Sequence, residues 1–266
     1  MPLLEIEDLE VQYARAGGPP VKAVRGVSLH VAAGETLGVV GESGCGKSTL
    51  AKAIVGLVRP CGGRIRYDGV EVTQRAWAGR EAYCRRVQMV FQDATGSLNP
   101  RMTVAAMLDE VRRVHHLAAR EERGQSAVAI TRLLAQVGLP AETAGAYPRE
   151  LSGGQCQRVS LARCLALEPR VLVADEPVSA LDVSVQARVL NLLRELQQRL
   201  GLALMLVSHD LAVVRTVCDR VCVMHNGVLV EQGAVRTIFE QPAHPYTQAL
   251  LAAVPDVDRA LQAREA

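Results

Sequence analysis

The 266-residue sequence contains no uninterrupted apolar stretch near the roughly 18 to 20 residues that a membrane-spanning helix needs. The longest candidate, Leu202 to Val207, is far too short and is typical of a buried strand. The N-terminal segment Met1–Asp8 carries acids where a secretory signal peptide needs bases. We therefore expect a cytoplasmic protein that, if it works at a membrane, docks onto something that spans it.

The cysteine spacing argues against a metal site, and the charge balance gives no reason to expect a nucleic-acid or anionic-membrane partner. The seven cysteines form no C-x-x-C pair, although Cys218 and Cys222 are four residues apart. Because the segment that holds them is typical of a strand, we expect reduced thiols and no metal site there. Lys plus Arg number 30 and Asp plus Glu number 28, so the charge requires neither nucleic acid nor an anionic membrane as partner.

The order of apolar patterns predicts an α/β fold with a mostly parallel sheet. The first thirty residues alternate apolar and polar, as antiparallel strands do, with a turn at Gly17–Pro20. Residues 103–146 are rich in Ala, Leu, Arg and Glu and predict a helical insertion. The other predicted strands are Thr36–Val40, Arg64–Tyr67, Val87–Phe91, Val171–Ala174, Leu202–Val207 and Arg220–Met224, and the predicted helices are Lys47–Val58, Val183–Leu200 and Leu211–Cys218.

A glycine-rich loop directly follows the strand predicted at Thr36–Val40. Glycines let a backbone turn and aim its N–H groups at phosphate oxygens, and the helix that follows adds positive potential. Lys47 supplies a charge for the terminal phosphates, the Ser48 hydroxyl is the expected Mg²⁺ ligand, and Thr49 is placed for the α-phosphate. The loop therefore predicts ATP binding by Gly41, Glu42, Ser43, Gly44, Cys45, Gly46, Lys47, Ser48 and Thr49.

Two carboxylates stand at the end of another buried strand, Val171–Ala174. Ligands gather at this end of the strands in a doubly wound sheet. Asp175 is expected to hold Mg²⁺ through water, and Glu176 to polarise the water that attacks the nucleotide. The glycine-rich loop and these two acids together predict that the protein hydrolyses ATP.

The segment Leu151–Gln155, with the sequence Leu-Ser-Gly-Gly-Gln, lies between the glycine loop and the acidic strand. A serine followed by two glycines at a helix start is itself a good anion site. The segment resembles the signature of the ATP-binding-cassette superfamily, and the likeness extends over about residues 4–255. The resemblance implies that the ATP of a partner cassette is contacted by Ser152, Gly153, Gly154 and Gln155.

Four further residues match positions that this family uses. By resemblance, Gln92 links Mg²⁺ and the attacking water to the helical insertion, and His209 contacts the γ-phosphate. Asp182 matches the loop that crosses the dimer interface. Tyr13 stands where the family places an aromatic ring against adenine.

Longer stretches resemble the second ATPase of oligopeptide and dipeptide importers. The tail His244–Leu250 is similar to a motif that peptide and nickel importers share. Many peptide-importer ATPases continue into a cysteine-containing extension, whereas here no cysteine follows Cys222. Peptide import is the first expectation, and nickel or metal-chelate import is the alternative. The other matching stretches are residues 34–48, 97–103, 152–158 and 176–184.

The resemblance also implies an architecture and partners. A P-loop NTPase core with an antiparallel β subdomain would comprise residues 1–92 and 168–243, a helical subdomain with the signature residues 93–167, and the tail residues 244–266. Two cassettes would sandwich two ATP molecules with Mg²⁺. The implied partners are a second, different ATPase subunit, two transmembrane permease subunits and an extracytoplasmic substrate-binding protein, with no nucleic acid.

The resemblance further places the chain as a peripheral protein on the cytoplasmic face of the inner membrane. Motion would pass to the permeases through a groove between core and helical insertion, to which Phe91–Pro100 would contribute. The rival readings are a cassette ATPase acting on ribosomes or DNA, an exporter cassette and a non-catalytic regulator. Cassette proteins that act on ribosomes or DNA usually carry a second cassette, a long coiled coil or a zinc insertion, and none of these is found in this sequence. Exporter cassettes are normally fused to membrane helices, and none is found here either. The third is disfavoured because Glu176 and His209 are both present.

Overall fold

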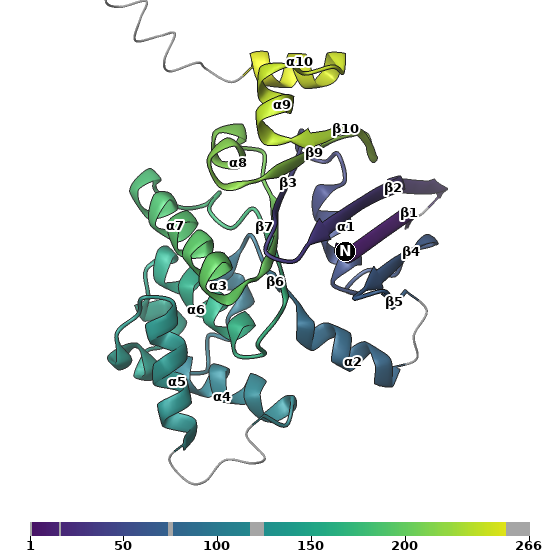
Figure 1. The fold of residues 1–266 in the computed structure, drawn as a ribbon. Coiled ribbons are helices and arrows are strands. Elements are labelled where there is room, and N and C mark those ends of the chain that lie inside the picture. Colours follow the sequence, from purple (N-terminus) through teal and green to yellow (C-terminus); the bar gives the residue numbers. More distant parts are fainter. Residues whose placement is uncertain (1, 16, 74–76, 118–124, 254–266) are drawn as a thin grey trace, which may run out of the picture.

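The computed structural model describes residues 2–15, 17–73, 77–117 and 125–253, which form two sheets with helices around them (Figure 1). One sheet has four antiparallel strands, and the other has six strands that are mostly parallel. The α/β fold predicted from the sequence is confirmed.

The antiparallel sheet has the strand order β2-β1-β4-β5. Alternate side chains of β1, among them Leu4 and Ile6, are buried on one face, as the two-residue period of a strand requires. This sheet covers one side of helix α1 (Lys47–Ile54), and its residues share a core with that helix. Its strands are β1 (Pro2–Arg15), β2 (Gly18–Ala32), β4 (Gly62–Tyr67) and β5 (Val70–Glu71).

The six-stranded sheet has the order β10-β9-β3-β8-β7-β6. Only the β9–β10 pair is antiparallel. All residues of β3, β7 and β8 are buried, which explains their continuous apolar sequences. The strands are β3 (Thr36–Val40), β6 (Val87–Val90), β7 (Val171–Asp175), β8 (Ala203–Val207), β9 (Arg220–His225) and β10 (Val228–Ala234).

Parallel pairing brings the carboxyl ends of β3, β8 and β7 to one edge of the sheet. The register aligns Val39 with Val207, and Val207 with Asp175. The glycine loop, Ser208 and Glu176 therefore leave the sheet side by side. This edge is where ligands bind in open α/β sheets.

Helices cover both faces of the six-stranded sheet (Figure 1). Polar side chains cap several helix starts: Thr103 accepts a hydrogen bond from the N–H of Ala106, and Asp210 accepts from those of Ala212 and Val213. The helices are α1 (Lys47–Ile54), α2 (Trp77–Arg86), α3 (Ala94–Ser97), α4 (Val104–Val114), α5 (Gln125–Gln136), η2 (Ala141–Gly145), η3 (Pro148–Glu150), α6 (Gly153–Leu165), α7 (Val183–Leu200), α8 (Leu211–Val217), α9 (Val235–Glu240) and α10 (Pro245–Ala252).

The core follows the alternation of the strands. Val171 and Val173 of β7 pack with α1 and the antiparallel sheet, whereas Leu172 and Ala174 pack with α4, α5, α6 and α7. The helical insertion thus shares its apolar cluster with one face of the sheet. The division into residues 1–92 with 168–243, 93–167 and 244–266 stays a prediction.

Two boundaries differ most from those predicted, whereas the ends of several other strands and helices are displaced by one or two residues. The turn predicted at Gly17–Pro20 lies before Gly18, which pairs with Arg15, so both prolines belong to β2. Proline is tolerated there because β2 is an edge strand and needs no ladder N–H on its open side. Helix α1 ends at Ile54 and not near Val58, because Gly56 takes a left-handed conformation with φ 79°.

The sequence did not predict α2, α9 or β10. Strand β10 forms a hairpin with β9 through Asn226 and Gly227, which have φ values of 48° and 84°. Asn-Gly is the strongest short hairpin signal, so this element could have been found in the sequence. Within the ranges described, no helix combines the length and apolar character needed to cross a membrane.

Candidate functional site

The glycine loop joins β3 to α1 at the carboxyl edge of the sheet. Gly46 is the N-cap of α1 and has φ 111°, in the region that favours glycine. A Cβ at this position would lie 2.2 Å from the carbonyl oxygen of Ala23. The loop can therefore approach β2 this closely only with glycine at residue 46.

Lys47 is folded under the loop. Its side chain is 4% exposed, and Nζ donates hydrogen bonds to the carbonyl oxygens of Gly41 at 2.7 Å and Glu42 at 2.8 Å. Burying an ammonium group is costly unless it is paired or hydrogen-bonded. The two carbonyls satisfy it here and keep its charge beside the loop backbone.

Ser48 and Asp175 bring two oxygen donors together. The Ser48 hydroxyl donates a 2.9 Å hydrogen bond to Asp175 Oδ1. Burial raises the pKa of the Asp175 carboxyl; the hydrogen bond from Ser48 opposes that rise and the neighbouring Glu176 carboxylate adds to it. A hydroxyl and a carboxylate are the hard oxygen ligands that Mg²⁺ takes, so this pair fits a magnesium ion.

Glu176 and His209 meet above the end of β7. Glu176 has φ 46°, and its N–H donates to the carbonyl of Val207 at 2.9 Å. His209 Nδ1 lies 3.2 Å from Glu176 Oε1. Left-handed backbone at a non-glycine residue costs on the order of 1–3 kcal/mol and is concentrated at functional sites. The carboxylate is only 13% exposed, whereas the imidazole is 53% exposed.

A cavity of about 290 Å³ opens beside the loop. It brings Gln92 and Glu176 to the loop residues, with which the sequence predicts them to serve one ATP, and adds Ala23, which no sequence pattern indicated. Tyr13 lies next to it, since its hydroxyl donates to Thr49 Oγ1 at 3.4 Å. The loop residues that line the cavity are Ser43, Gly44, Gly46, Lys47, Ser48 and Thr49.

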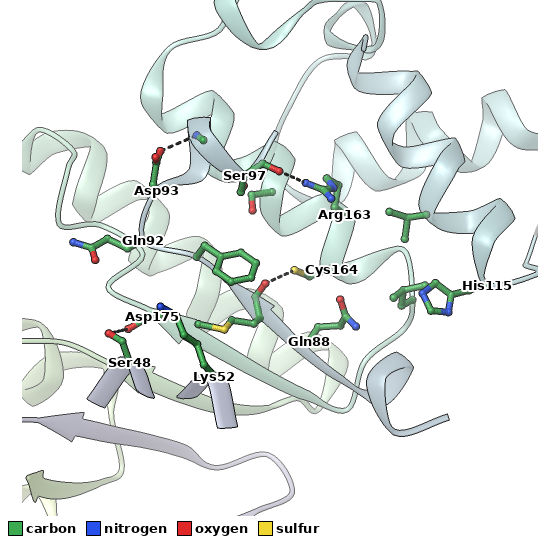
Figure 2. Close-up of a pocket in the computed structure, with 16 residues that line it drawn as sticks. Ser48, Lys52, Gln88, Gln92, Asp93, Ser97, His115, Arg163, Cys164 and Asp175 are labelled. Atoms are coloured by element: carbon green, nitrogen blue, oxygen red, sulfur yellow. Dashed lines mark hydrogen bonds between the residues drawn. The ribbon is translucent and has the colours of Figure 1, made fainter. Parts of the chain in front are cut away.

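A second cavity, of about 700 Å³, extends from this edge toward the helical insertion. Figure 2 shows Ser48, Gln92 and Asp175 at one end, with His115 at the other and Arg163 above. Arg163 Nη1 donates to the carbonyl of Ser97 at 2.7 Å, which ties α6 to α3. The residues that line this cavity thus extend from Ser48 of the loop to α4 and α6.

The signature segment begins α6. The Ser152 hydroxyl accepts from the N–H of Gln155 at 3.3 Å, and Gln155 Oε1 accepts from the N–H of Ser152 at 2.9 Å. This reciprocal pair is a capping box. Ser152 and Gly153 are exposed, and neither they, Gly154 nor Gln155 line the loop cavity. Within this chain the signature is thus separate from the loop.

Asp182 is the exposed N-cap of α7, and its side chain makes no capping hydrogen bond. Its helix packs against the signature: Leu181 and Val185 would contact a Cβ placed on Gly153 and Gly154. The structure therefore places Asp182 and the signature on neighbouring elements, outside the loop cavity. The functional roles of all these residues stay predictions.

One loop contact was not predicted. The hydroxyl of Tyr246 accepts a 3.1 Å hydrogen bond from the N–H of Glu42. The sequence had marked Tyr246 only as part of a subfamily tail, and no spacing rule joins residues 204 positions apart. The thiol of Cys45 is buried in the same loop, and burial raises its pKa.

Two known families match parts of this chain. The family described as "ABC transporter" matches residues 24–179, and "Oligopeptide/dipeptide transporter, C-terminal region" matches residues 230–266. The chain is 47% identical to "Oligopeptide transport ATP-binding protein OppF" of Escherichia coli (strain K12), over 98% of this chain and 80% of that protein. It is 48% identical to "Probable peptide ABC transporter ATP-binding protein y4tS" of Sinorhizobium fredii, over 97% and 74%.

Solved structures share the fold. The chain superposes with a TM-score of 0.77 and 27% identity on the ATP-binding cassette MJ0796 bound to ADP and Pi, over 88% of this chain and 99% of that chain. It superposes with a TM-score of 0.78 and 25% identity on cbiO1 from Clostridium perfringens, described as part of the ABC transporter complex cbiONQ, over 98% and 99%.

Proposed function

The chain belongs to the ABC transporter family and hydrolyses ATP, and from this premise we propose that it powers the import of oligopeptides across a cytoplasmic membrane. The observation that carries the proposal is the likeness to the oligopeptide protein OppF along 98% of this chain. The match of residues 230–266 to the oligopeptide/dipeptide C-terminal region supports the same substrate class.

The loop binds the nucleotide phosphates in this proposal. Backbone N–H groups of a glycine loop at a helix start favour anions, and the Lys47 ammonium adds a full positive charge. Lys47 Nζ exchanges its bonds to Gly41 and Glu42 for phosphate oxygens when ATP enters. Tyr13, beside Thr49 at the rim, offers its ring to the adenine.

The residues present fit a magnesium ion, which Ser48 and Asp175 would hold, with Gln92 beside them. When bound, Mg²⁺ neutralises charge that develops on the phosphate oxygens. Asp175 must be ionised for this.

Glu176 is the proposed general base. Its carboxylate lines the loop cavity and is restrained by the contact between Oε1 and His209 Nδ1. Glu176 accepts a proton from the attacking water, while His209 orients Glu176 and reaches the γ-phosphate. Gln92, in the same cavity wall, orients that water as well.

A second cassette completes each site. Ser152 and Gly153 are exposed at the start of α6 and do not line this chain's own loop cavity, which supports their use on a partner's ATP. Asp182, exposed on the adjacent α7, lies at the same interface. The proposed partner is a different ATPase subunit, so that the two composite sites form in a heterodimer.

The larger cavity is the proposed route to the membrane. Because Gln92 lines both cavities, a shift of this residue on hydrolysis reaches the helical insertion directly. Two permease subunits would dock there, with Phe91, Asp93 and Ser97 in the wall. The chain would thus sit peripherally on the cytoplasmic face of the inner membrane, and a substrate-binding protein would deliver peptide from the other side.

The test is transport by the reconstituted importer. The chain, its partner ATPase, the permeases and the binding protein are placed in liposomes, and uptake of a radiolabelled oligopeptide is measured with ATP inside. The proposal expects ATP-dependent uptake that Lys47→Ala abolishes. Uptake of a nickel chelate but of no peptide, or peptide uptake unaffected by Lys47→Ala, would contradict it.

A further inference from the structure

The phosphate loop has two sides, and different groups hold each. Ser43, Gly44 and Gly46 to Thr49 line the nucleotide cavity, whereas Glu42 and Cys45 do not. On this outer side, the N–H of Gly227 donates to the Cys45 carbonyl at 2.9 Å, and the N–H of Glu42 donates to the Tyr246 hydroxyl at 3.1 Å. The β9–β10 hairpin and the C-terminal helix α10 therefore both bind the loop from behind.

The three residues that begin α10 each contribute to this contact. His244 caps the helix by accepting the N–H of Tyr246 on Nδ1 at 3.1 Å, and Pro245 occupies the first helical position. These two residues fix the direction in which Tyr246 leaves the helix. Its ring then stacks on His225 at the end of β9, with centroids 3.9 Å apart.

Helix α10 is itself anchored to the sheet. The Glu231 carboxylate of β10 accepts the N–H groups of Ala243 at 2.8 Å and His244 at 3.1 Å. Hydrogen bonds to a charged group are stronger than neutral ones, so this joint holds the start of α10 in place. Tyr246 thus reaches the loop from a fixed support rather than from a loose tail.

We propose that Tyr246 is a positioning residue for ATP binding, which holds the outer side of the phosphate loop so that its inner N–H groups face the nucleotide. The N–H of Glu42 lies outside the cavity, and the phenol oxygen of Tyr246 is its acceptor. Glu42 is exposed, so water replaces this acceptor when the hydroxyl is removed, but water does not tie the loop to α10. Without the phenol oxygen, the loop gains freedom that nucleotide binding must then remove. The tail therefore sets ATP affinity without touching ATP.

The decisive variant is Tyr246→Phe, which removes the hydroxyl and keeps the ring on His225. Tyr147→Phe is the matched control. Tyr147 directly precedes η3, far in sequence from the phosphate loop, and its hydroxyl takes no part in the hydrogen bond from Glu42 that Tyr246 accepts. We expect the full-length Tyr246→Phe chain to bind mant-ATP about three- to tenfold more weakly, the range for loss of one neutral hydrogen bond.

Two further readouts separate positioning from general damage. Amide exchange at Glu42, followed by NMR in the nucleotide-free chain, is faster in Tyr246→Phe and unchanged in Tyr147→Phe. In the assembled transporter, KM for ATP rises while kcat is retained, because Lys47, Glu176 and His209 are untouched. Wild-type affinity in Tyr246→Phe overturns the proposal whatever the exchange rate, and so does weaker binding without faster exchange at Glu42.

Discussion

The hydroxyl of Ser48, at the start of α1, donates a 2.9 Å hydrogen bond to Oδ1 of Asp175, the last residue of β7. The contact joins the phosphate loop to the acidic strand across 127 residues of sequence. It also holds a carboxylate that is only 3% exposed. Mg²⁺ binding needs the Asp175 carboxylate to be ionised, whereas a buried ionised carboxylate destabilises the folded, nucleotide-free chain.

Replacing Asp175 by Asn tests that conflict. Asn keeps an oxygen that accepts from Ser48 and removes the buried charge. We expect the nucleotide-free variant to melt about 2–4 °C higher at neutral pH, the shift that about 1 kcal/mol produces in a chain of this size. Stabilisation by Mg-ATP should be lost in the same calorimetric experiment. A lower melting temperature of the free variant would contradict the account.

The same pair predicts a pH dependence. Because burial raises the pKa of Asp175 in the folded chain, its ionised form costs stability above that folded-state pKa. This cost disappears as pH falls through the folded-state pKa toward the unfolded one. The stability gained by Asp175→Asn should therefore shrink at acid pH, as thermal unfolding measured from neutral to acid pH will show.

Replacing Glu176 by Gln separates binding from turnover. The amide keeps the shape of the side chain but accepts no proton, so kcat should fall about 10²- to 10⁴-fold. ATP affinity should be unchanged, because the loop groups stay in place. Glu195→Gln, on an exposed part of α7, is the matched control. Steady-state hydrolysis near the wild-type rate, with the change in both cassettes, would remove Glu176 from its proposed role.

Alkylation of Cys45 reports on the loop. The thiol is 6% exposed and its pKa is raised by burial, so little reactive thiolate is available, and Cys61, which is exposed, should react first. Because Cys45 is buried behind the loop, an alkyl group on it should displace the loop backbone and so weaken nucleotide binding, and Mg-ATP should slow the modification by holding the loop in place. Mass spectrometry of a Cys61→Ser chain labelled with iodoacetamide measures this. Equal labelling rates with and without Mg-ATP would refute the protection.

Gly154→Ala probes the packing of the signature helix on α7. The new Cβ would lie 2.5 Å from Val185 Cγ1, and overpacking of this kind costs about 1–3 kcal/mol. Gly145→Ala is the control, since no atom lies within 4 Å of its added Cβ. In a Val185→Ala background, Gly154→Ala should cost much less in thermal unfolding. An equal cost in both backgrounds would show that the contact with Val185 is not the cause.

Much of the fold follows from patterns within single segments. Helix α7 spans Val183–Leu200, as its periodicity predicts, and β3 spans Thr36–Val40. Both are long or strongly apolar segments with clear limits. Helix α1 was predicted too long because the apolar pattern continues past Gly56, whereas a left-handed glycine ends the helix.

The site was harder to predict because it depends on pairing between segments. Sequence motifs named Ser48, Gln92, Asp175 and Glu176, and the parallel register of the strands brings them to one edge. No local pattern indicates that Tyr246 reaches the loop, since that contact depends on how α10 lies on β10. The spacing of residues in the sequence therefore indicates which side chains carry the chemistry of the site. It does not indicate which distant segments hold the site in place.

The separation of the signature from the loop is tested most directly by measuring hydrolysis in the isolated chain and after addition of its partner cassette. The isolated chain, kept monomeric as checked by light scattering, should bind ATP but turn it over barely above background. Adding the second cassette should raise the rate strongly, and a partner whose signature serine is replaced by arginine should not. Full turnover by the monomer would contradict the account, because the loop would then need no facing signature.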